Sequence, residues 1–286
     1  MVKLSEYELK RGGLKFVLLI AIETLKAELT KQFFLMANFI ISLVDLIIGT
    51  LAYFYLAIFI GEAMNRYITA YGMSYAEYLL IGILGNIIGG FFIHSLYEAI
   101  SIGYWSSETD LYITSPIGLK GMLLGYVLLG LFWRCITIFV LVVSALMIGV
   151  PLHYQNLLQV LEVLLVGLLP FIGLGLISAS TFTLINSKSG SPISWLIEIL
   201  QRIFSGYYFP IQLLPPYIRL ISLGLPHTYF FEALRLSVAK GYWIHQTPHL
   251  LYPLIIQSII LIPTGIILFK YSIIKAERTG DLSRWT

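Results

Sequence analysis

Apolar runs long enough to cross a membrane recur along most of this chain, and charged residues are scarce. Of its 286 residues, 58% are hydrophobic and only 12% are charged, and the mean hydropathy is +0.86. Water-soluble domains carry about 25% charged residues, so this composition excludes an ordinary soluble globular protein. The fold class that remains is an all-α membrane protein, with no room for a separate soluble catalytic domain.

Six apolar runs have the length of a membrane-spanning helix, which needs roughly 20 apolar residues. We place the six transmembrane helices at 33–60, 75–100, 121–149, 156–186, 193–209 and 248–270. They make one domain over residues 33–270, followed by a tail over residues 271–286.

The N-terminal residues 1–32 combine basic side chains with apolar ones at helical spacing. Leu18, Ile22, Leu25 and Leu29 fall on one side of a helix over residues 14–32, whereas Lys26 falls on another. This pattern predicts an amphipathic helix in the membrane interface, with its basic residues at the lipid headgroups. The alternative is a helix packed on a partner protein.

Residues 209–243 are apolar but interrupted by prolines, which cannot lie within one continuous helix because each lacks an amide donor and clashes with the preceding turn. These prolines are Pro210, Pro215, Pro216 and Pro226. Non-helical backbone at membrane depth must be shielded by protein or face water. We therefore predict an extracellular re-entrant helical hairpin between the fifth and sixth transmembrane helices.

Lys and Arg are distributed unevenly on the two sides of the predicted spans. Of the 18, twelve lie on one side, four on the other, and Arg134 and Arg202 lie within spans. The richer side holds Lys3, Lys10, Arg11, Lys15, Lys26, Lys31, Lys120, Lys188, Lys270, Lys275, Arg278 and Arg284, and the poorer side holds Arg66, Arg219, Arg235 and Lys240. Because cytoplasmic loops carry the excess of basic residues, both termini are predicted to be cytoplasmic.

Sequence motifs for catalysis or nucleotide binding are not found. The chain has no G-x-x-x-x-G-K-[ST] phosphate loop and no G-x-S-x-G nucleophile turn. His245 and His249 have the spacing of a zinc-protease pair, but the catalytic glutamate is missing and Pro248 breaks the helix. We therefore predict no metal site and no enzymatic activity for this chain.

The predicted cytoplasmic loop over residues 101–120 mixes acidic, aromatic and apolar residues and contains Pro116. A short amphipathic helix there would present Trp105, Leu111, Tyr112 and Ile113 to a groove on another protein. A helix held only by lipid is the alternative.

Two stretches of the sequence resemble the type-2 permease family of ATP-binding-cassette exporters, which includes drug and polysaccharide export permeases. The first is Glu108-Thr-Asp-Leu-Tyr-Ile-Thr-Ser-Pro-Ile-Gly-Leu-Lys-Gly-Met-Leu-Leu-Gly125. The second runs from Ser205 to Arg235, where the residues that match the family pattern include Pro210, Pro215, Pro216, Pro226, Tyr229, Glu232 and Arg235. The chain departs from that pattern at Gly103, Tyr104, Trp105, Ser107, Glu108, Tyr126 and His227.

This resemblance implies a half-transporter in the plasma membrane of a prokaryote. Two permease copies, identical or related, would pair in the membrane, and two separate ATPase subunits would dock on the cytoplasmic side. ATP and Mg²⁺ would bind the ATPase, no cofactor would bind this chain, and no nucleic acid is implied. The docking helix would cover about 104–116, with contacts from Trp105, Glu108, Asp110, Leu111, Tyr112, Ile113 and Pro116.

The expected function is export of an amphipathic, drug-like or lipid-like substrate. A polysaccharide or lipid-linked glycan permease of the same family is the alternative. A competitor from another class is an ion-coupled secondary transporter, for which inverted repeats would be expected, and the sequence shows none. A lipid-modifying membrane enzyme would need a nucleophile, a base and a metal set, and none converges in the sequence.

Polar side chains inside apolar spans are the candidates for a substrate pathway, because a charge in the membrane is costly unless it faces a cavity or a partner. In the first, second and fifth spans these residues are Asn38, Asp45, Tyr53, Asn86, His94, Glu198, Arg202 and Tyr207. Glu198 and Arg202 are four residues apart on one helix face, which predicts an ion pair.

Overall fold

The computed structural model describes residues 14–34, 36–106, 119–151 and 155–279. Within these ranges all regular elements are helices. Five helical stretches are long and apolar enough to cross a membrane: Ile40–Tyr71, Tyr75–Trp105, Gly121–Met147, Leu157–Leu184 and Pro248–Ala276. The chain is therefore all-helical, with the helices of a multi-pass membrane protein.

The long helices are α2 (Met36–Ile68), α3 (Tyr75–Trp105), α5 (Leu119–Met147) and α11 (Pro248–Thr279). The predicted first span ended at residue 60, but α2 continues to Ile68 and passes into a short 3₁₀ turn, η2 (Thr69–Tyr71). Gly72, in a left-handed conformation with φ of 71°, ends this turn. Ser74 then caps α3, because its hydroxyl accepts the Glu77 amide while the Glu77 carboxylate accepts the Ser74 amide.

The predicted fourth span consists of two helices, α6 (Leu157–Gly167) and α7 (Leu169–Leu184). Pro170 explains the break, because its ring nitrogen has no hydrogen to donate and it lies in the first turn of α7. The predicted fifth span contains the 13-residue helix α8 (Pro192–Phe204), which ends before residue 209.

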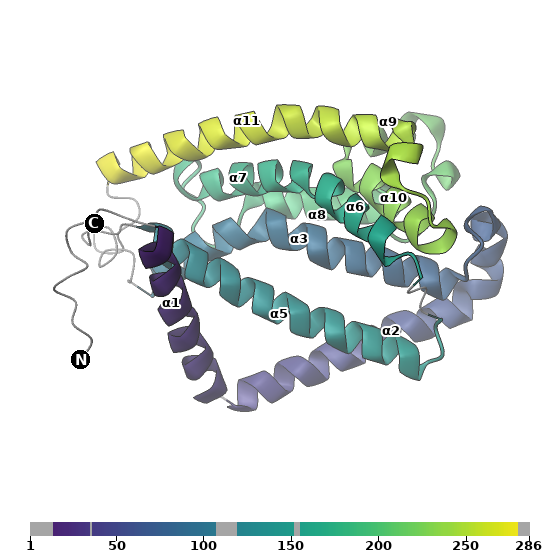
Figure 1. The fold of residues 1–286 in the computed structure, drawn as a ribbon, viewed down its shortest axis with the longest axis horizontal. Coiled ribbons are helices and arrows are strands. Elements are labelled where there is room, and N and C mark those ends of the chain that lie inside the picture. Colours follow the sequence, from purple (N-terminus) through teal and green to yellow (C-terminus); the bar gives the residue numbers. More distant parts are fainter. Residues whose placement is uncertain (1–13, 35, 107–118, 152–154, 280–286) are drawn as a thin grey trace.

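After α8 the chain forms η3 (Ile211–Leu213), α9 (Pro216–Gly224), α10 (Pro226–Lys240) and η4 (Ile244–Gln246). Pro216 and Pro226 lie in the first turns of α9 and α10, where a missing amide hydrogen costs nothing. The helices α9 and α10 lie at one end of the molecule, whereas the start of α1 and the end of α11 lie at the other (Figure 1).

The N-terminal helix α1 (Leu14–Phe34) packs across α5 (Figure 1). Gly121 and Gly125 of α5 allow this approach, because a Cβ atom added there would lie 2.7 Å from Ile20 and 2.6 Å from Thr24. Leu18, Leu19 and Ile22 remain exposed on the other side of α1. Part of the apolar surface of α1 is therefore left uncovered, whereas Leu25 and Leu29 pack against the buried cluster around Met122 and Tyr126.

Helix α7 is packed between α3 and α11 through glycines. A Cβ atom on Gly175 would lie 2.0 Å from the carbonyl oxygen of Phe92 in α3, and one on Gly173 would lie 2.5 Å from the Leu261 backbone in α11. Small residues allow such close contact between helices in a membrane, where no hydrophobic effect drives association. The triplet α3, α7 and α11 forms the most closely packed part of the fold.

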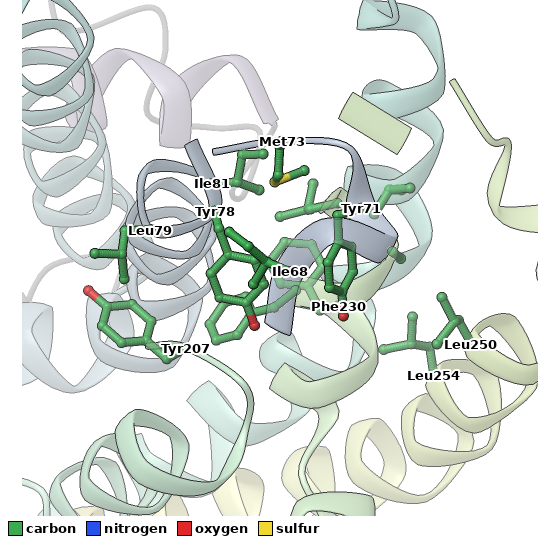
Figure 2. Packing of buried hydrophobic residues seen from close by; sticks show 14 of the residues in the cluster. Ile68, Tyr71, Met73, Tyr78, Leu79, Ile81, Tyr207, Phe230, Leu250 and Leu254 are labelled. Carbon is green, nitrogen blue, oxygen red and sulfur yellow. The ribbon is translucent and has the colours of Figure 1, made fainter. Parts of the chain in front are cut away.

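The largest buried cluster lies where α3, η2, α10 and α11 meet. Figure 2 shows Tyr71, Tyr78 and Phe230 close together, with Leu250 and Leu254 of α11 beside them. The rings of Tyr71 and Tyr78 meet edge to face with centroids 5.6 Å apart. Burial of these large side chains fixes the end of the molecule that holds α9 and α10.

Candidate functional site

A polar cavity of about 100 Å³ lies between helices that are otherwise apolar. We call it the Gln201 cavity. Its polar lining comes from α3, α5, α8 and α10, and consists of Asn86, His94, Arg134, Ser194, Glu198, Gln201 and His227. Polar side chains from separate helices thus line one shared space, which a lipid-facing surface would not require.

Two buried polar atoms in the Gln201 cavity have no hydrogen-bond partner. The Gln201 amide nitrogen donates to the Asn86 side-chain oxygen at 2.8 Å, but Gln201 Oε1 is unpaired, as is His227 Nδ1. Both side chains are only 1% exposed. Buried polar groups are nearly always paired with protein, water or a ligand, so these two atoms are unsatisfied hydrogen-bonding groups in the cavity wall.

A group of buried hydroxyls fixes the start of α8. Ser191 accepts the Ser194 amide at 3.2 Å and the Ser178 hydroxyl at 2.9 Å, and Thr181 donates to it at 3.3 Å. Ser178 and Ser194 also share a hydrogen bond. These contacts tie α8 to α7, and the helical spacing then places Ser194, Glu198 and Gln201 on one face.

A second cavity, of about 420 Å³, adjoins the first along α3 and α8. We call it the Glu98 cavity. It shares His94, Ser194 and Glu198 with the Gln201 cavity, and its other lining residues are Tyr97, Glu98, Ser101, Ile102, Ser189, Gly190, Ser191 and Trp195. The two neighbouring cavities lie along α3 and α8, and we refer to them together as the polar passage.

The predicted ion pair between Glu198 and Arg202 is present, with the guanidinium donating to the carboxylate. Arg202 is exposed and lines neither cavity. Arg134, which the sequence left without a partner, lies in the Gln201 cavity wall.

Of the predicted pathway residues, Asn86, His94 and Glu198 line the Gln201 cavity. Asp45 is exposed on α2 and Tyr53 is 41% exposed there. Tyr207 is buried in the large cluster, and its ring packs against Phe231. Asn38 lies in α2, but its side chain is outside the described part of the structure.

Sequence reasoning missed Gln201, His227, Ser194 and Glu98. The helical spacing could have indicated three of them, since Glu98 is four residues after His94, Ser194 four before Glu198 and Gln201 three after Glu198. No local signal could have found His227, because only the packing of α10 against α3 and α8 brings it to the cavity.

The C-terminal end of α3 is tied to the loop that connects α7 and α8. The Trp105 indole donates to the Lys188 carbonyl at 3.2 Å, and the Tyr97 hydroxyl donates to the Ser187 carbonyl at 2.7 Å. The Lys188 ammonium lies 4.1 Å from the Phe182 ring centre and 5.1 Å from that of Tyr104. We call these contacts the α3 latch. Trp105 is half exposed, while the other predicted docking residues, Glu108 to Pro116, lie outside the described residues.

The motif after α8 makes a second connection, at the opposite end of α3. The carbonyl oxygens of residues 206–208, which follow α8, accept hydrogen bonds from Tyr78 (2.9 Å), Arg235 (3.2 Å) and Tyr75 (3.1 Å), respectively. Glu232 accepts from Tyr71 at 2.7 Å, and Tyr229 donates to the Leu223 carbonyl at 2.9 Å. The non-helical backbone that follows α8 is thus satisfied by side chains.

The fold and these cavities define the class of the molecule: it is an all-helical protein whose five long apolar helices can cross a membrane and whose cavities are lined by polar residues from several helices. No known family model matches the chain, and no curated protein resembles it closely enough to be counted as a match.

Proposed function

We propose that the chain is the permease subunit of an ATP-binding-cassette exporter, which moves an amphipathic substrate outward while separate ATPase subunits hydrolyse ATP. The polar passage between apolar helices α3 and α8 carries this proposal, because a polar route inside a membrane bundle serves transport. The sequence resemblance implies that separate ATPase subunits provide the energy, because the chain's own sequence contains no nucleotide-binding motif.

In this proposal α8 is the sixth crossing. Its 13 residues span about 20 Å, which is short of a hydrocarbon core about 30 Å thick. Residues 205–209 complete the crossing as non-helical backbone. The hydrogen bonds from Tyr75, Tyr78 and Arg235 to this segment support a position at membrane depth, where carbonyls need protein partners.

The helices α9 and α10 are then the re-entrant hairpin on the outside, and both termini face the cytoplasm. The excess of Lys and Arg on that side supports this orientation. The two permease copies would assemble in the membrane, with ATP and Mg²⁺ bound only by the ATPase partners.

The α3 latch supports a path by which motion of the ATPase subunits would reach the polar passage. The expected docking helix begins at the C-terminal end of α3, and the latch connects that end to the loop before α8. A displacement of the docking helix would therefore move both walls of the polar passage together.

Isolation of the tagged chain from its native membrane tests this proposal. We expect an ATPase subunit to be isolated with it, and to be lost from the doubly substituted Leu111→Asp, Ile113→Asp chain although that chain still inserts into the membrane. The matched control is Leu282→Asp in the tail, which keeps the ATPase. A wild-type chain that isolates without any ATPase and transports on an ion gradient contradicts the exporter and favours a secondary transporter.

A further inference from the structure

The Glu98 cavity is negatively charged. Its lining includes the carboxylates of Glu98 and Glu198 but no Lys or Arg residue. Glu198 already pairs with Arg202, whereas Glu98 makes no ion pair with any described residue. Glu98 is exposed near the C-terminal end of α3 and lines the same cavity as Glu198, so the negative charge on this side of the passage favours a positive guest.

The rest of the lining suits an amphipathic guest. The rings of Tyr97 and Trp195 and the side chain of Ile102 provide apolar and aromatic surface, and the volume of about 420 Å³ lies in the range of small-molecule sites, about 300–1,000 Å³. Aromatic faces also attract organic cations. The Gln201 cavity differs in charge, because Arg134 lies in its wall together with Glu198.

The unpaired atoms of the Gln201 cavity are an independent sign of a ligand. Gln201 Oε1 can only accept a hydrogen bond, and it lies in a wall shared with His227, whose Nδ1 is also unpaired. The two cavities are neighbours, because they share the lining residues His94, Ser194 and Glu198.

We propose that the joined cavities bind an amphipathic organic cation, with its protonated amine at Glu98 and Glu198 and a hydrogen-bond donor directed to Gln201. That this cation is also the exported substrate rests on the proposed function. Binding itself does not, because it needs only the residues of this chain.

Fluorescence titration of the purified chain in phosphatidylcholine nanodiscs, with no ATPase present, tests the inference. The probes are dansylcadaverine, which carries a protonated amine, its neutral N-acetyl derivative, and dansyl-aminohexanoate, which carries a carboxylate instead. We expect saturable binding of the amine and affinities about tenfold or more weaker for the neutral and anionic analogues, because a carboxylate nearby discriminates by at least that factor.

Glu98→Gln is the decisive variant, because Glu98 is exposed and has no ion-pair partner among described residues, so its loss leaves the fold intact. We expect about tenfold weaker amine binding for Glu98→Gln, and no saturable binding when Glu198→Gln is added. The control is Glu62→Gln, since exposed Glu62 of α2 lines neither cavity and should bind as the wild type does.

Equal binding of the three probes, absence of saturable amine binding, or unchanged affinity in Glu98→Gln would overturn the inference. These outcomes are separate from a failure of the exporter proposal. If the chain binds the amine but isolates without an ATPase, the cation site is supported and the exporter proposal is contradicted. If the chain isolates with an ATPase but does not bind the amine, the exporter proposal is supported and the cation site is contradicted.

Discussion

The guanidinium of Arg235 lies 3.5 Å from the centre of the Tyr78 ring, although the two residues are 157 positions apart. Arg235 is 1% exposed and donates to the carbonyls of Tyr78 and Tyr207. The Tyr78 hydroxyl donates to the Gly206 carbonyl at 2.9 Å. This pair therefore holds the chain that leaves α8 against α3.

Replacement of Arg235 by Lys should destabilise the protein by about 2–4 kcal/mol, because an ammonium cannot cover the Tyr78 ring and reach both carbonyls, which are then left unsatisfied. Thermal unfolding in detergent measures the effect. The matched control is Arg66→Lys, since Arg66 lies 4.6 Å from the Tyr67 ring centre but is exposed. Similar losses of stability in Arg235→Lys and Arg66→Lys would show that the burial of Arg235 does not contribute to the stability of the protein.

Replacement of Gly175 by Ala should cost about 1–3 kcal/mol or more, because the new methyl would lie 2.0 Å from the Phe92 carbonyl oxygen and must push α3 and α7 apart. Gly49→Ala is the control, since no atom lies within 4 Å of a Cβ atom placed there. Denaturant unfolding of both variants checks this. A Gly175→Ala chain as stable as Gly49→Ala would contradict the observed helix contact.

Removal of the α3 latch should loosen the loop before α8. Trp105→Phe and Tyr97→Phe each keep an aromatic ring but lose the hydrogen bond to the Lys188 or Ser187 carbonyl. Amide hydrogen exchange over residues 185–191 should rise about fivefold to tenfold, since a lost hydrogen bond is worth about 1 kcal/mol. Tyr104→Phe, which removes a hydroxyl but keeps the ring beside Lys188, should leave this exchange unchanged. Wild-type exchange in all three variants would argue against the latch.

Stability should fall as the solution becomes acidic, partly because of His227. Burial, with a smaller effect of His94, lowers the pKa of His227 to about 3 from an ordinary 6.5. Below pH 6.5 the unfolded chain therefore binds a proton that the folded chain excludes, and this residue's contribution declines by about 2 kcal/mol between pH 7 and pH 5. The contribution of the neutral His227 ring to stability is complete only well above pH 6.5.

Unfolding measured at pH 7 and pH 5 tests this pH dependence. His227→Leu should reduce the loss of stability between the two pH values, whereas His249→Leu, which changes an exposed residue, should not. Equal pH dependence in His227→Leu and the wild type would contradict the burial of a neutral ring.

Much of the helical framework could be predicted from local sequence. The apolar runs predicted all five long stretches, and the prolines within residues 209–243 predicted that this segment is broken into short helices. The boundaries were less accurate. The end of α2 at Ile68 was missed because Glu62, Asn65 and Arg66 are polar, yet they continue the same helix beyond its apolar part.

The candidate site was predictable only in part. Polarity within apolar runs selected Asn86, His94 and Glu198, which the structure places around one cavity, because the cost of a polar group in a membrane is a property of the residue itself. The sequence could not show that Asp45 lies on an exposed face of α2. The cost of a charge in the membrane is relieved by a cavity, by a partner protein or by water, and the sequence does not distinguish these surroundings.

The sequence by itself therefore determined that this chain is a bundle of membrane-length helices, because helix length and apolarity are set by neighbouring residues. Only the tertiary structure decided that His227 joins Gln201 in one cavity and that Arg235 covers Tyr78. These relationships join residues far apart in the chain, and they depend on which helices approach closely. That choice is made by the glycine contacts and the buried cluster, which hydropathy does not describe.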